Sequence, residues 1–92
     1  MTHNGWTNYQ TWTVISVIDN TESLYNFCKD AVKEVKEKYA ENERISPLIS
    51  ILQNIVKNMK PQTNNNIWGP LINNAYESIN FPEIARSMLE DY

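Results

Sequence analysis

The sequence has one cysteine, one histidine and two glycines among its 92 residues. Cys28 cannot form a disulfide within the chain, and we expect it to be a small core residue. No apolar run reaches the roughly 18 residues of a membrane-spanning helix, and no signal peptide is recognisable. We therefore expect no membrane association and a reducing cytoplasm. His3 has no neighbouring ligands at metal-binding spacing, so neither a metal nor a cofactor is expected.

The same scarcities argue against an enzyme. Gly5 and Gly69 are the only glycines, so no glycine-rich phosphate loop exists. General acid–base catalysis needs a histidine or paired carboxylates in a pocket, and most acids here fall on one expected solvent face. The formal charge of −3 argues against direct nucleic-acid binding, and also against a helix-turn-helix regulator, because both need a basic surface.

Residues 5–20 hold two of the three tryptophans and the densest apolar run, and we expect later segments to pack on them. Thr7 and Gln10 fit a capping box, with Asn8 as an alternative cap one residue later. The many β-branched residues leave a strand as the competing interpretation, although strict alternation is absent. Helical spacing of apolar residues predicts a central helix, and they are Tyr9, Trp12, Ile15 and Ile18.

Four more helical segments are predicted. One runs over about 21–40, one begins with Ser46 as cap and Pro47 in the first position, and one spans 67–79. The last is capped by Asn80, with Glu83 completing a box-like arrangement, and residues 90–92 are expected to fray. The expected core positions are Leu24, Cys28, Ala31, Val35, Tyr39, Leu48, Leu52, Ile55, Met59, Ile67, Leu71, Ala75, Ile79, Ile84, Ala85, Met88 and Leu89.

The predicted fold is therefore all-α, a single domain over 1–92 built as a small bundle of four to five helices. Residues 1–6 are expected to be loose and 61–66 to form a loop. Trp6 precedes the first cap, where it either staples the helix start or anchors a contact. Trp68 is either a lid on the core or part of a recognition surface.

Two segments carry a resemblance. Trp6-Thr7-Asn8-Tyr9-Gln10-Thr11-Trp12-Thr13-Val14, followed by Ile18-Asp19-Asn20, resembles the W-x-N-Y-x-T-W-x-V opening of small uncharacterised proteins of bacteriophages, prophages and plasmids. Residues 79–86, Ile-Asn-Phe-Pro-Glu-Ile-Ala-Arg, are similar to the V-D-W-x-E-I-A segment of that family. Val17 and the pair Phe81-Pro82 depart from its pattern. The resemblance implies a genetic setting, an accessory protein of a mobile element in a bacterium, and no activity.

That setting suggests a protein that binds and inhibits a bacterial host protein complex in the host cytoplasm. Anti-CRISPR and antirestriction factors are small products of this kind, an analogy of size and source. The alternative is an oligomeric sponge for signalling nucleotides, in which aromatic side chains stack on a base. A homo-oligomer would also relieve the limited core of so short a chain. The candidate partner-binding residues are Trp6, Asn8, Tyr9, Trp12, Asn64, Asn65 and Trp68.

Overall fold

A computed structural model describes residues 4–59 and 67–92. Within these ranges the chain forms helices and no strand, so the all-α prediction is confirmed and the strand alternative for residues 5–20 is wrong. The predicted loop 61–66 lies outside the described residues. In chain order the elements are α1 (Tyr9–Asn20), α2 (Glu22–Lys38), the short 3-10 helix η1 (Glu41–Glu43), α3 (Ile45–Asn58), α4 (Trp68–Glu77) and α5 (Phe81–Asp91).

The start of α1 is fixed by Asn8, the alternative cap. Asn8 has an extended backbone, and its side-chain oxygen accepts from the Thr11 N–H at 2.9 Å. The predicted capping box of Thr7 and Gln10 is wrong. The Thr7 N–H that the box would have used donates instead to a Glu83 carboxylate oxygen at 3.1 Å.

The start of α5 lies beside the start of α1. Asn80 caps α5 as expected, since its side-chain oxygen accepts from the Glu83 N–H at 3.1 Å. The Glu83 side chain does not fold back onto Asn80, as a box-like arrangement would require, because it accepts from Thr7. The Asn80 N–H donates instead to the Thr11 hydroxyl at 2.9 Å. Two helix starts that are distant in sequence therefore share one hydrogen-bond network.

The start of α3 differs from the prediction by two residues. The helix begins at Ile45 with Arg44 as its cap, so Ser46 is not the cap and Pro47 is the third helical residue. Proline is tolerated there because the first N–H groups of a helix have no partner within the helix. The Arg44 guanidinium donates to the backbone oxygens of Tyr39 and Lys36 at 3.1 and 3.2 Å. This contact ties the start of α3 to the end of α2, which stops at 38 and not at 40.

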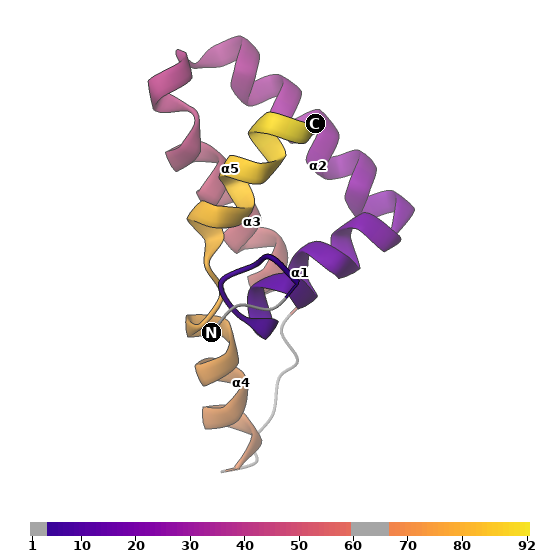
Figure 1. The fold of residues 1–92 in the computed structure, drawn as a ribbon, viewed down its shortest axis with the longest axis vertical. Helices are drawn as coiled ribbons and strands as arrows, with labels where there is room; N and C mark the ends of the chain where they lie inside the picture. Colours follow the sequence, from indigo (N-terminus) through magenta and orange to yellow (C-terminus); the bar gives the residue numbers. More distant parts are fainter. Residues whose placement is uncertain (1–3, 60–66) are drawn as a thin grey trace.

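The core lies where α2, α3 and α5 meet the inner face of α1 (Figure 1). The most extensive helix pairing is that of α3 with α5, followed by α1 with α2. Trp6 packs against this core, so the predicted loose N-terminus makes a core contact within its described part. The Cys28 side chain is buried there as a small apolar residue, as expected. The buried hydrophobic side chains are Ile15, Ile18, Cys28, Ala31, Val32, Val35, Leu48, Leu52, Phe81, Ile84, Ala85 and Met88.

The C-terminal residue is anchored, and the prediction that residues 90–92 fray is wrong. The Tyr92 hydroxyl donates to an Asp19 carboxylate oxygen at 2.6 Å, and the Tyr92 ring packs edge-on against Tyr25. The Lys36 ammonium donates to the Tyr92 backbone oxygen at 3.0 Å. The end of α5 is thereby joined to both α1 and α2.

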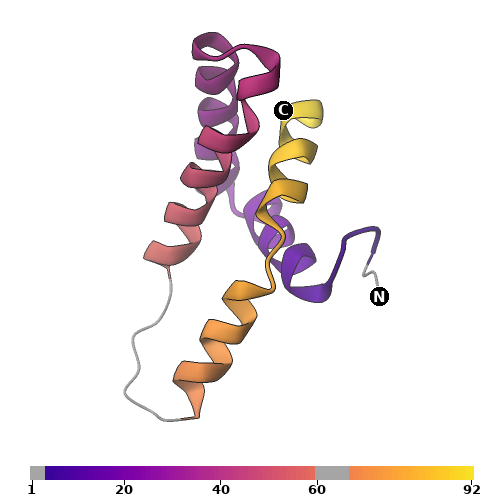
Figure 2. The same cartoon turned by 90° about the vertical axis from the view of Figure 1, so that its left-hand side faces the viewer.

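Helix α4 extends away from the rest of the bundle, as the two perpendicular views show (Figures 1 and 2). No residue of α4 is buried. The expected core positions Ile67 and Leu71 are 69% and 51% exposed, so that part of the core prediction is wrong. The predicted apolar side of this helix exists, but no other described helix packs over much of it. None of the described helices is both long enough and apolar enough to cross a bilayer.

Candidate functional site: an apolar groove between α1, α3 and α4

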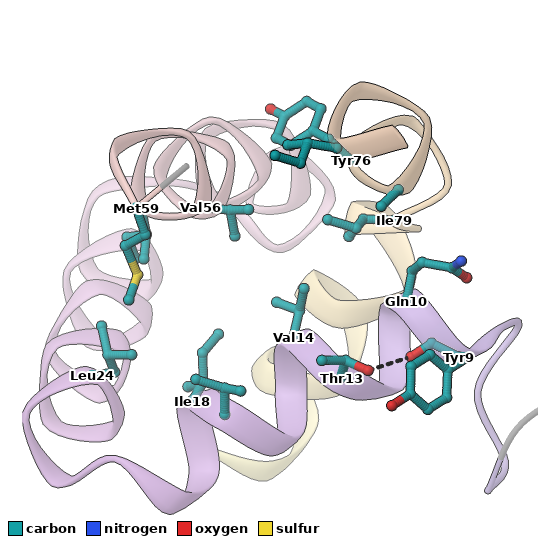
Figure 3. A pocket seen from close by; sticks show the side chains of 14 residues that line it. Tyr9, Gln10, Thr13, Val14, Ile18, Leu24, Val56, Met59, Tyr76 and Ile79 are labelled. Atoms are coloured by element: carbon teal, nitrogen blue, oxygen red, sulfur yellow. Dashed lines mark hydrogen bonds between the residues drawn. The ribbon is translucent and has the colours of Figure 1, made fainter. Parts of the chain in front are cut away.

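The structure contains an apolar groove of about 460 Å³. One wall is α1, the opposite wall is formed by α3 and α4, and Leu24 of α2 closes one end (Figure 3). The volume falls in the range of about 300 to 1,000 Å³ that is typical of ligand sites. The lining residues are Tyr9, Gln10, Thr13, Val14, Val17, Ile18, Leu24, Ile55, Val56, Met59, Ile72, Ala75, Tyr76 and Ile79.

The groove is uncharged. None of its lining residues is an aspartate, glutamate, lysine or arginine. The sequence explains this property, because residues 5–18 and 61–76 contain no charged side chain. A surface of this kind favours apolar or neutral polar partners and offers no cation for a phosphate group.

The outer face of α1 continues the groove. Tyr9 is 58% exposed, and its ring lies 5.7 Å from that of half-buried Trp12, measured between ring centroids. A shallow hollow runs beside this aromatic pair toward Asn20 and Thr21. Tyr9, Thr13 and Val17 border both hollows, so the groove and the aromatic face form one continuous surface.

The exposed edge of α4 is the third part of this region. It consists of Ile67, Trp68 and Leu71, of which Trp68 is 59% exposed. The interpretation of Trp68 as a lid on the core is therefore wrong, and a place in a recognition surface stays a prediction. Met59 at the end of α3 is 58% exposed and borders the groove.

A model of a protein family matches the whole chain, residues 1–92. The chain belongs to the family of unknown function DUF7249. No curated protein and no solved structure matches it. Membership in DUF7249 brings no activity with it, so the function of this protein has to be argued from its own residues.

The predicted binding residues of this DUF7249 protein fall into separate groups. Exposed Tyr9 and half-buried Trp12 lie together on α1, whereas exposed Trp68 lies at the start of α4. Trp6 and Asn8 have structural roles, since Trp6 packs on the core and Asn8 caps α1. The side-chain nitrogen of Asn8 also donates to the Ser78 backbone oxygen at 2.7 Å, just ahead of α5. Asn64 and Asn65 lie outside the described residues.

In the part of the chain that the structure describes, no group of three or more histidine, cysteine, aspartate or glutamate residues could hold a metal ion. Burial, followed by the nearby Asp19 charge, raises the pKa of the Cys28 thiol to about 11. A thiol with so high a pKa is a poor nucleophile at neutral pH. Glu34 and Lys38 form an i,i+4 ion pair at 2.6 Å on the exposed face of α2.

Sequence reasoning missed most of the groove. Val14, Ile55, Ile72 and Ile79 have apolar spacing that is typical of core residues, and nothing in that spacing separates a groove wall from a core. One signal was available. Three long stretches, 5–18, 45–56 and 61–76, have no charged side chain, and described residues of each of them line the groove.

Proposed function

We propose that this protein is an accessory protein of a bacteriophage or other mobile element that binds and inhibits a bacterial host protein complex. The proposed class is an anti-defence factor of the anti-CRISPR or antirestriction type, acting in the host cytoplasm. The resemblance of residues 6–20 and 79–86 to small phage, prophage and plasmid proteins supports the genetic setting. It does not identify the target.

The observation that supports a binding role is the uncharged aromatic face of α1. Interface centres are enriched in tyrosine and tryptophan and depleted of charge. Tyr9 and Trp12 provide such a pair, beside a hollow lined by neutral side chains. Because Thr11 and Asn8 on the other side of α1 hold the helix against α5, the pair is presented on a fixed element. A rigid aromatic anchor loses little entropy on binding.

The nucleotide sponge is the weaker alternative. Stacking on Tyr9 or Trp12 would suit a base, but phosphates need lysine or arginine close by. Neither hollow has a lysine or arginine in its lining. A thermal shift of several degrees with one member of a nucleotide panel would favour the sponge over the inhibitor, since a ligand stabilises the fold by mass action.

The inhibitor proposal is tested in bacterial strains that each carry one CRISPR–Cas or restriction–modification system. Producing the wild-type protein should raise the plaque count of a targeted phage in at least one strain. Tyr9→Ser and the double variant Tyr9→Ser/Trp12→Ser should lose this relief. Phe27→Ser is the matched control, because Phe27 is 54% exposed on α2, away from both hollows.

Helix content and melting temperature of each variant separate a lost contact from a lost fold. Tyr9→Ser alone is informative even if the double variant melts early, because the Tyr9 side chain is mostly exposed. Relief that survives in Tyr9→Ser and disappears in Phe27→Ser would contradict the proposed face. No relief by the wild type in any strain would overturn the anti-defence role.

A further inference from the structure

The groove and the exposed edge of α4 are two apolar features with matching character on one molecule. The groove is an uncharged channel open to solvent, and its mouth carries exposed Tyr9, Val17 and Met59. The edge is a short apolar ridge formed by Ile67, Trp68 and Leu71. Apolar helix edges bind in apolar grooves in many complexes.

The ridge continues the apolar side of α4 toward the start of the helix, beyond the part that lines the groove. Ile72, Ala75, Tyr76 and Ile79 line the groove (Figure 3), whereas Ile67, Trp68 and Leu71 are not among its lining residues. The ridge of a molecule is therefore placed outside its own groove. A second copy presents the same ridge to the groove of the first, and a two-fold axis makes the exchange reciprocal.

We propose that two copies of this chain form a symmetric dimer in which the α4 ridge of each copy lies in the groove of the other. The inference goes beyond the anti-defence proposal and does not depend on it. The aromatic pair Tyr9 and Trp12 lies at the border of this interface, and the Trp12 side of α1 remains available to another partner.

The apolar area is of the size that such a dimer needs. Six exposed side chains surround the groove or form the ridge. Together they expose on the order of 500 Å². A standard interface buries about 800 Å² on each partner, part of which is a polar rim. Gln10 and Thr13 line the groove and provide neutral polar groups for such a rim. The six side chains are Tyr9, Val17, Met59, Ile67, Trp68 and Leu71.

The charge distribution favours a second copy as the occupant. Near a two-fold axis a residue lies close to its own counterpart, so a charged side chain there would face an identical charge. The groove has no charged side chain, and α4 has only Glu77, in its last position. A chain of net charge −3 can therefore associate with itself through this face without bringing like charges together.

The first test is the molar mass by light scattering and sedimentation velocity, from submicromolar to submillimolar protein. The wild type should be a dimer that dissociates on dilution. Leu71→Asp should raise the dissociation constant by about a hundredfold, because the loss of a buried leucine is felt twice in a symmetric dimer. Phe27→Asp is the control at an exposed hydrophobic residue outside the groove, and it should leave the dimer unchanged.

The second test places the ridge in the groove. In a Cys28→Ala background, Met59→Cys and Leu71→Cys chains are mixed and oxidised, so that a mixed disulfide can form only between two copies. It should form readily, whereas Met59→Cys mixed with Phe27→Cys should not cross-link. A wild-type monomer at every concentration would overturn the proposal. So would a dimer that Leu71→Asp leaves intact or that fails to form the Met59–Leu71 cross-link.

Discussion

The Thr11 hydroxyl accepts a hydrogen bond from the Asn80 backbone N–H at 2.9 Å, although 69 positions separate the two residues. The same hydroxyl donates to the side-chain oxygen of Asn8 at 2.7 Å, and Thr11 is completely buried. Asn8 caps α1 and Asn80 caps α5. The Asn-Tyr-x-Thr part of the N-terminal motif therefore joins the starts of two helices.

Replacing the Thr11 hydroxyl should destabilise the fold more than shortening the side chain. Thr11→Val keeps the shape but leaves the partly buried Asn80 N–H without its acceptor, which costs about 2 kcal/mol of unfolding free energy. Thr11→Ser keeps the hydroxyl and loses one methyl group, at a cost of about 1 kcal/mol. Denaturant unfolding of the two variants measures the difference. Equal losses in Thr11→Val and Thr11→Ser would show that packing, and not the shared hydrogen bonds, is the main contribution of this residue.

The C-terminal tyrosine should contribute measurably to stability. Tyr92→Phe removes the hydrogen bond to the Asp19 carboxylate and should lower the unfolding free energy by about 1 kcal/mol. For a chain of this size the melting temperature then falls by about 4 to 8 °C. Tyr39→Phe is the control, because Tyr39 is 41% exposed and should change stability by less than about 0.5 kcal/mol. A frayed C-terminus would instead give the same small effect for both variants.

Stability should fall in alkaline solution because of Cys28. Burial raises the pKa of its thiol from 9.0 to about 11, so the unfolded chain releases this proton first as the pH rises. Between pH 9 and 11 the folded state holds more protons than the unfolded state, and the unfolding free energy decreases with pH. Below pH 9 the contribution is fully present. The Tyr92 hydroxyl, whose pKa is also raised by burial and by its bond to Asp19, acts in the same direction.

The Cys28 contribution is isolated by comparing the slope of stability against pH in the wild type and in Cys28→Ala. The variant is less stable at every pH because it leaves a small cavity, so only the slopes are compared. Cys28→Ala should have the shallower slope between pH 9 and 11. Identical slopes would mean that the thiol titrates normally and that its burial is relieved by local opening.

Helix α4 should open more readily than the rest of the bundle. It has no buried residue, whereas α5 buries Phe81, Ile84, Ala85 and Met88. Local opening is easiest where few apolar contacts are lost. Amide hydrogen exchange in dilute protein should therefore be faster in α4 than in α3 or α5. Protection of α4 equal to that of α5 at high dilution would contradict the exposed position described here.

The helices that pack well could be predicted from the sequence alone. The spacing of apolar residues in α2 placed Cys28, Ala31 and Val35 in the core, and all three are buried. Tyr39, the last residue of the same series, lies beyond the helix and is 41% exposed. Asn80 was recognisable as the cap of α5, and it is the cap. The start of α3 could not be placed as well, because the Ser46-Pro47 signal is local while the contact of Arg44 with the end of α2 is not.

The candidate site could be predicted only in part. Tyr9 and Trp12 belonged to the predicted apolar side of the first helix and were also candidate binding residues, and Trp68 was left between a lid and a recognition surface. In the structure Tyr9 and Trp68 are exposed and Trp12 is half-buried. The sequence left the roles of Trp6 and Asn8 open. A tryptophan before a helix can staple the helix start or anchor a contact, and an asparagine there can cap the helix or bind a partner. The groove itself was not predictable, because its walls come from four helices and its shape depends on how far apart they are held.

By itself, the sequence determined that this chain is helical, which helices have an apolar side, and that three long stretches have no charge. These properties can be read from the sequence because each depends only on residues that are close together along the chain. Only the tertiary structure decided which apolar sides are covered. Ile67 and Leu71 have the same spacing as true core residues, yet they are exposed because no other helix packs over them. A side chain is buried only when another surface packs over it. That surface comes from parts of the chain distant in sequence, and local spacing gives no information about them.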